Sequence, residues 1–231
     1  MGSTGKYDGR VGDITRVDGI DDATAGAATK MIERLMDVGI DGRGRFASAQ
    51  KVADVAIAEH PDVEGAIGAT VRSHLLLGAV GGFVTGLGGF ITMSVALPAN
   101  VLEFYLVATR MVATIASIRG YDIRRPEVRS AILLALVGAD SDDLLGKAGY
   151  GGTGRLANLA AQRLPGPALM ALNKGVAFRL LTRVGRKSVT RFGRAVPLVG
   201  GLVGAGVDTF LLTRIADHAR REFPPRARSG S

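Results

Sequence analysis

The chain has 231 residues, of which 47% are hydrophobic and 33 are glycine, so it is long enough to enclose a hydrophobic core. It contains no cysteine, which excludes disulfides, thiol nucleophiles and metal sites built on thiolates. Its net charge of +8 favours an anionic partner, such as a membrane surface or a nucleic acid.

The first 22 residues are polar and rich in glycine, and they lack the apolar stretch of a signal peptide. The opening Met-Gly does not match the N-myristoylation pattern, because Lys6 stands where that pattern has serine or threonine. We therefore expect a mobile leader over residues 1–22, a helical domain over residues 23–223 and a disordered tail over residues 224–231.

Apolar residues recur at helical spacing through most of the remaining chain. The helices expected from this spacing, and from the glycines and prolines at their ends, are 23–38, 45–59, a third from Pro61, 101–118, 127–137, 155–164, 168–184 and 208–223. Gly39 is expected to end the first of them and Gly120 the fourth, Pro126 to begin the next, and residues 165–167 to break the chain. No segment alternates polar and apolar residues in the manner of a strand. The pattern predicts an all-α fold, a compact multi-helix bundle with two glycine-rich apolar helices packed at its centre.

The stretch LLLGAVGGFVTGLGGFITM, residues 75–93, has no charge and six glycines. On a helix, the small face of this stretch holds Gly78, Gly82, Gly86 and Gly89, and the opposite face holds large side chains such as Phe83 and Phe90. A small face lets a second helix approach closely. Because an interior glycine costs about 1 kcal/mol relative to alanine in water, the stretch favours an apolar and crowded environment.

Two environments satisfy this requirement. Residues 75–97 are 23 uncharged positions, long enough to cross about 30 Å of hydrocarbon as a transmembrane helix. The alternative is a helix that is buried in the bundle or dips into a membrane as one arm of a hairpin. Charges at Glu103 and Arg110 in the next helix favour this second interpretation.

A second glycine cluster, PLVGGLVGAGV, sets Gly200, Gly204 and Asp208 on one helical face. It lies in 13 uncharged residues, 195–207, which are too few to span a bilayer. We expect this small face to pack against that of the first glycine-rich helix.

Four charged residues flank these apolar segments. Glu103 and Arg110 lie seven residues apart and therefore share one face of their helix. Asp208 and Arg214 in the last helix are their expected partners, so the sequence predicts buried ion pairs among the four. The alternative is that all four charges face solvent.

Basic residues are concentrated in one segment. Between Leu144 and Val207 there are ten cations and no acid, whereas the rest of the chain has 19 basic and 21 acidic residues. The candidate residues for binding an anionic surface are Lys174, Arg179, Arg183, Arg186, Lys187, Arg191 and Arg194. Their spacing forms one stripe if the helix continues past Gly185. Such a helix suits an anionic membrane, where each cation contributes about 1 kcal/mol, while nucleic acid and a merely solvated face are the alternatives.

No catalytic or metal-binding signature stands out. Residues 149–154, GYGGTG, match the spacing of dinucleotide-binding loops, but no strand is expected before them and no acidic residue follows at the required distance. The histidines are isolated, and His74 is expected at a polar shoulder of its helix. The sequence therefore predicts a non-catalytic protein and identifies no cofactor and no metal.

Three segments carry a resemblance to a known family. They are the glycine-rich run that closes in ITMSVALPANVLEFYLVATRMVATIASIRGYD, then EVRSAILLALVGAD and AVPLVGGLVGAGVDTFLLTRIADHAR, which together cover most of residues 62–220. In these segments the chain resembles the EcsC family. The resemblance implies a bacterial, helical, membrane-associated protein, and the naming of the family after a gene beside an ABC exporter implies a transport or secretion setting. It brings no catalytic residues.

The expected function is that of a non-catalytic protein at the cytoplasmic face of a bacterial membrane, either peripheral or partly inserted. The expected partner is an anionic phospholipid membrane, with a membrane complex or a second copy of the chain as further partners through the glycine faces. The protein would act as a scaffold or as an accessory to a transport complex. The alternatives are a soluble helical module that binds nucleic acid or protein, and a hydrolase whose site forms only in three dimensions.

Overall fold

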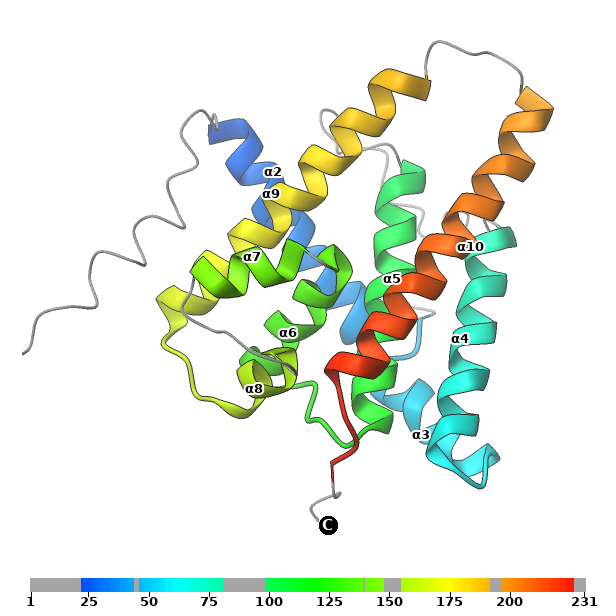
Figure 1. Ribbon diagram of the computed structural model, residues 1–231, viewed down its shortest axis with the longest axis vertical. Helices are drawn as coiled ribbons and strands as arrows, with labels where there is room; N and C mark the ends of the chain where they lie inside the picture. Colours follow the sequence, from blue (N-terminus) through cyan, green and yellow to red (C-terminus); the bar gives the residue numbers. More distant parts are fainter. Residues whose placement is uncertain are drawn as a thin grey trace, which may run out of the picture.

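The computed structural model describes residues 22–43, 46–80, 99–138, 140–147, 155–191 and 197–226. Within these ranges the chain forms nine α-helices, one π-helical segment and no strand, so the all-α prediction is confirmed. The helices pack into a compact bundle (Figure 1). The leader expected over residues 1–22 lies outside the described residues except for Asp22, which begins the first helix.

The first helix, α2 (Asp22–Arg34), continues without interruption into the π-helical segment η1 (Leu35–Ile40). The sequence predicted a helix end at Gly39, but this glycine lies inside η1. A Cβ atom at Gly39 would come within 2.9 Å of the Thr109 side chain, so glycine allows η1 to approach the helix that carries Thr109. The chain turns away at Gly42, whose φ of 74° is left-handed and favours glycine.

The next two helices are α3 (Ala49–Glu59) and α4 (Val63–Val80). Ser48 caps α3, because its hydroxyl accepts a hydrogen bond of 3.2 Å from the backbone N–H of Lys51. Before α4, the carboxylate of Asp62 accepts a bond of 2.7 Å from the backbone N–H of Gly65. Both caps supply acceptors to N–H groups that have no partner within their own helix.

The interior of the bundle is formed by α5 (Ala99–Ile118) and α6 (Pro126–Val137). Ten of the twelve residues of α6 are buried, and α5 is buried from Tyr105 to its end. The chain leaves α5 at Gly120, whose φ is 87°, and α6 begins at Pro126, so both predicted boundaries are confirmed. α5 packs against η1, α3, α4 and α6, which makes it the helix around which the others are arranged.

Three helices follow, α7 (Asp140–Lys147), α8 (Arg155–Ala161) and α9 (Gly166–Arg191). The sequence predicted a break over residues 165–167, but α9 already begins at Gly166. Pro167 fits the first turn of a helix, because its missing N–H would have no intrahelical partner there. α9 packs against α2, α6 and α7.

The last helix, α10 (Pro197–Glu222), packs against α4, α5 and α6. The chain stays attached to the bundle beyond it. The backbone N–H of Arg226 donates a bond of 2.9 Å to the carbonyl of Arg119, and its guanidinium lies 4.4 Å from the centroid of the Tyr121 ring. The disordered tail predicted over residues 224–231 is therefore wrong for Arg226, whereas residues 227–231 lie outside the described part.

Candidate membrane-facing end

Four helix termini lie toward one end of the molecule, in the upper part of Figure 1: the end of α4, the start of α5, the end of α9 and the start of α10. In sequence these termini flank residues 81–98 and 192–196, which lie outside the described residues. The first glycine-rich stretch is therefore joined to the bundle at this end, and the second forms the start of α10. Of the predicted packing and surface residues, the undescribed ranges contain Gly82, Phe83, Gly86, Gly89, Phe90 and Arg194.

Gly78 is described, and it faces α10. A Cβ atom at Gly78 would lie 2.9 Å from Cδ1 of Leu212, a fully buried residue. This close approach of α4 and α10 is the packing that small residues permit. The described atom near it belongs to a leucine. Gly200 and Gly204 belong to the helical start of α10, and the burial of this part lies outside the description, so the expected packing of the two glycine faces stays a prediction.

Large apolar side chains are exposed at the same level of α4 and α10. Leu76 is 66% exposed, Leu77 40% and Phe210 60%. Leu76 and Phe210 precede Gly78 and Leu212 by two positions, which turns them about 160° away from the contact between the helices. These side chains therefore lie on the outer sides of α4 and α10, where large exposed apolar groups are available for a membrane or protein contact.

Arg214 lies beside this apolar surface. Its guanidinium carbon is 5.8 Å from the centroid of the Phe210 ring, within the range of a cation–π contact. Because Arg214 is exposed, the prediction that it belongs to a buried ion pair is wrong. The physical reason is the rotation of α10, whose inward face is taken by Leu212, Ala216 and Ala219.

The other three residues predicted to form ion pairs lie deeper than Arg214. Arg110 is buried in α5, and this burial lowers its pKa. Its Nη1 atom has no hydrogen-bond partner among the described residues. Glu103 and Asp208 are half-buried, and each of them interacts with other groups. Arg110 is thus a cation that is largely removed from water inside the bundle.

His74 is also removed from water, although the sequence predicted a polar helix shoulder for it. The residue is 2% exposed, and its Nδ1 lies 2.7 Å from the carbonyl oxygen of Thr70. A carbonyl oxygen only accepts, so Nδ1 carries the proton of the ring. Burial lowers the pKa of His74 from 6.5 to about 4, and the positive charge of Arg110 lowers it as well. The imidazole is therefore neutral at physiological pH.

The basic segment lies on α9, which is one continuous helix through Arg191. The condition for a single basic stripe, a helix that continues past Gly185, is therefore met. Lys174 is exposed and Arg179 is half-buried. Only the backbone is described for Arg183, Arg186, Lys187 and Arg191.

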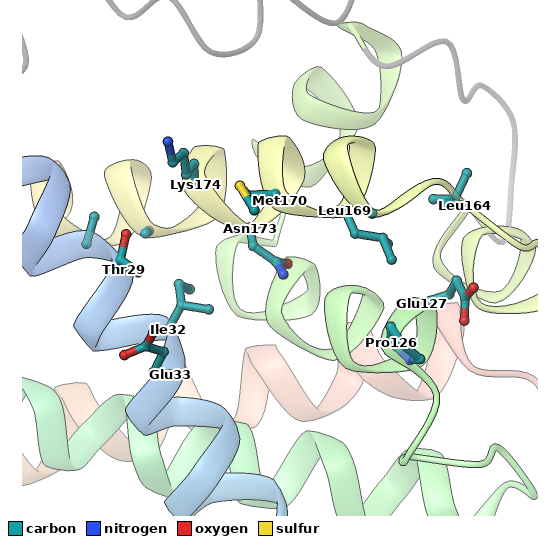
Figure 2. Close-up of a pocket in the computed structure, with 13 residues that line it drawn as sticks. Thr29, Ile32, Glu33, Pro126, Glu127, Leu164, Leu169, Met170, Asn173 and Lys174 are labelled. Carbon is teal, nitrogen blue, oxygen red and sulfur yellow. The ribbon is translucent and has the colours of Figure 1, made fainter.

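A pocket that the sequence did not predict opens between α2, α6 and α9 (Figure 2). Its volume is about 530 Å³. Apolar side chains that line it include Ala28, Ile32, Leu164, Leu169, Met170 and Ala177. Because α2 and α9 are far apart in the chain, no local pattern indicates this pocket.

The rejection of residues 149–154 as a dinucleotide loop is supported by the element before them. That element is α7, a helix, whereas the dinucleotide fold needs a strand there. Residues 149–154 themselves lie outside the described part.

Among the described helices, none combines the length and the hydrophobicity that crossing a bilayer requires. The fold defines an all-α bundle in which α4 and α10 pack closely at Gly78 and Leu212. The chain belongs to the EcsC protein family, whose model matches residues 22–227. The comparisons with curated proteins and with solved structures find no match.

Proposed function

We propose that this protein is a non-catalytic, membrane-associated protein that docks on the anionic cytoplasmic face of a bacterial membrane. The end that carries the two glycine-rich segments contacts or enters the bilayer, and the basic face of α9 holds the anionic headgroups. In this position the protein acts as a scaffold or as an accessory to a transport or secretion complex.

The observation that carries this proposal is the exposure of Leu76 and Leu77 near the end of α4, and of Phe210 in α10 close to the contact between Gly78 and Leu212. Moving such side chains from water into an acyl environment stabilises the bound state by roughly 25 cal/mol for each Å² of apolar surface. Arg214 beside Phe210 is suited to the interface, because its long side chain places the charge among headgroups while its stem stays apolar.

The basic face of α9 supplies the second contribution. Lys174 is exposed, and the backbone that carries the further cations up to Arg191 belongs to the same continuous helix. Each cation near an anionic surface contributes about 1 kcal/mol, and salt screens this contribution. The two contributions therefore respond differently to ionic strength, which makes them separable.

Liposome flotation of the purified chain tests the proposal. Vesicles of phosphatidylcholine alone and vesicles containing phosphatidylglycerol are compared, each before and after a wash in about 1 M NaCl. We expect flotation on the anionic vesicles, with a fraction that survives the salt wash because apolar contacts are not screened. A folded chain that floats with neither vesicle contradicts membrane docking.

A pair of variants locates the contact. Leu76→Asp combined with Phe210→Asp places charges in the proposed interface without changing buried residues, so we expect at least about tenfold weaker vesicle binding. Val55→Asp is the matched control, because Val55 is 47% exposed on α3, away from this end of the molecule. If Val55→Asp weakens binding as much as the double variant, docking through this end is wrong.

The basic helix alone also suits a nucleic acid, and one measurement separates the two partners. Fluorescence anisotropy with a labelled DNA duplex reports binding whose affinity falls steeply with salt. Tight duplex binding together with absent flotation would replace the membrane proposal with the soluble-module alternative.

A further inference from the structure

The pocket between α2, α6 and α9 lies apart from the proposed membrane-facing surface of α4 and α10. Its volume of about 530 Å³ falls within the range of roughly 300–1,000 Å³ that is usual for small-molecule sites. α2 and α6 form its sides and the first half of α9 forms its roof in the view of Figure 2. The pocket is partly open to solvent, and mostly apolar walls with a few polar groups are typical of sites for small apolar ligands.

The side chains that face the pocket are mostly hydrocarbon. Ile32 on α2 and Leu169 on α9 point toward the space that the helices enclose (Figure 2). Met170 lies at the mouth and is 63% exposed. Burying this exposed thioether and the pocket walls against a hydrocarbon ligand would remove apolar surface from water, which is the main driving force for such binding.

The polar groups of the pocket restrict where a charged head can lie. Glu127 is bound within the fold: its own backbone N–H and the neighbouring Arg125, at 3.3 Å, hold the pKa of its carboxyl below the usual value. Glu33 is an exposed anion on the α2 side. Lys174 is exposed on the α9 side, and its ammonium points outward from the pocket (Figure 2). The anionic headgroup of a ligand would therefore lie at the rim of the pocket, next to the ammonium group of Lys174.

Asn173 occupies the middle of the pocket. Its side chain points from α9 into the enclosed space (Figure 2), and its Oδ1 atom has no hydrogen-bond partner among the described residues. A larger side chain at residue 173 would therefore fill the pocket.

The pocket extends along α9. Its lining residues on this helix run from Gly166 to Ala177, which is a length of about 16 Å. A site of this length with apolar walls suits an extended hydrocarbon chain.

We infer that this pocket binds a single long acyl chain, with its anionic head beside Lys174. A free fatty acid and a lysophospholipid share this chemistry. The inference goes beyond membrane docking and does not depend on it, because binding of a single-chain amphiphile is measured in solution without vesicles.

The test uses displacement of the fluorescent fatty acid cis-parinaric acid from the full chain. Palmitate and lysophosphatidylglycerol are the two competitors, each kept below its aggregation concentration. Displacement by palmitate alone would identify the ligand as a free fatty acid. Displacement by the lysolipid alone would identify it as a lysophospholipid. Displacement by both would show that the protein recognises the acyl chain. A folded chain that does not bind the fluorescent acid overturns the inference.

Two variants with the same added bulk place the ligand. Asn173→Phe fills the pocket, so we expect at least about tenfold weaker binding of the probe. Thr182→Phe adds the same ring to an exposed position of the same helix outside the pocket, so we expect affinity within about twofold of the wild type. Equal affinities of the two folded variants would overturn this location.

A second readout does not depend on how Asn173→Phe folds. The chain has no tryptophan, so Met170→Trp introduces a single fluorophore at the mouth of the pocket. Palmitate should shift its emission to shorter wavelength, whereas Thr182→Trp should show no shift. An unchanged emission of Met170→Trp at saturating palmitate would also overturn the inference.

Discussion

Gly78 of α4 and Leu212 of α10 meet so closely that a Cβ atom at residue 78 would lie 2.9 Å from the Cδ1 atom of the leucine. Leu212 is fully buried, so its side chain has little room to withdraw. Glycine at residue 78 therefore allows the short distance between α4 and α10.

Gly78→Leu is expected to destabilise the protein by about 1–3 kcal/mol or more, because the added side chain forces α4 and α10 apart. Gly78→Ala should cost much less, since one methyl displaces only the tip of a leucine and alanine gains about 1 kcal/mol of helix propensity. Chemical denaturation followed by circular dichroism measures both values. Equal stabilities of Gly78→Leu and the wild type would show that the contact does not limit packing.

Gly26→Ala is the matched control for helix propensity. Gly26 is exposed in α2, and nothing lies within 4 Å of a Cβ atom built there. We expect this variant to be more stable than the wild type by about 0.5–1 kcal/mol, because alanine fits the helix and meets no neighbour. A destabilised Gly26→Ala would indicate that α2 is packed differently.

The stability of the fold should fall in acid because His74 is buried as a neutral ring. Its pKa is about 4 in the folded protein and 6.5 as an ordinary value, so the unfolded chain binds a proton first as the pH falls. The contribution is complete above pH 6.5 and is lost between about pH 6.5 and 4. The shift corresponds to about 3 kcal/mol, measured as the free energy of unfolding at a series of pH values.

His74→Asn should flatten this pH dependence, because asparagine keeps a donor for the Thr70 carbonyl and does not titrate. His60→Asn is the control, since His60 also contacts the carbonyl of the residue four positions earlier, at 2.9 Å from Ala56, but at a half-buried site. The control should retain the loss of stability in acid. If His74→Asn retains the full loss, other groups account for it.

Phe223 should contribute more to stability than any exposed aromatic residue of α10. It is fully buried just beyond the helix, and its ring meets that of Tyr121 edge-on at 5.1 Å between centroids. Phe223→Ala is expected to cost about 3–5 kcal/mol. Phe210→Ala, which removes the same ring from a position 60% exposed, should stay within about 0.5 kcal/mol of the wild type in thermal and chemical unfolding. A similar loss of stability in both variants would contradict the burial of Phe223 against Tyr121.

Asp41 and Arg129 connect the end of η1 to α6 through two parallel hydrogen bonds of 2.7 and 2.8 Å. Because Asp41 is 50% exposed, solvent screens the pair, and we expect a coupling of only about 0.5–1 kcal/mol. A double-mutant cycle with Asp41→Asn and Arg129→Gln measures this coupling in denaturant. A coupling that does not weaken with added salt would contradict an ion pair at the surface.

The sequence predicts helix boundaries correctly where a single glycine or proline ends or begins the helix. Gly120 ends α5 with a left-handed φ and Pro126 begins α6, as predicted. Gly39 shows the limit of such signals: it was interpreted as a helix end, but it serves the approach of η1 to Thr109. A glycine that permits a close contact and a glycine that ends a helix look alike in the sequence.

The candidate functional residues were accessible only in part. The basic character of α9 and the small face at Gly78 follow from spacing along one helix, which is a local property. The burial of His74 and the exposure of Arg214 depend on how α4 and α10 are rotated against their neighbours. Side-chain type alone would have placed His74 at the surface, and the expected ion pair placed Arg214 in the interior.

By itself the sequence determined the all-α class, the basic segment and the resemblance to the EcsC family, because periodicity, composition and family motifs are written along the chain. Only the tertiary structure decided that Gly78 meets Leu212, that Leu76 and Phe210 are exposed on the outer sides of α4 and α10, and that α2, α6 and α9 line a pocket. These features arise where helices distant in sequence pack, and the free energy that selects such contacts is shared by the whole core.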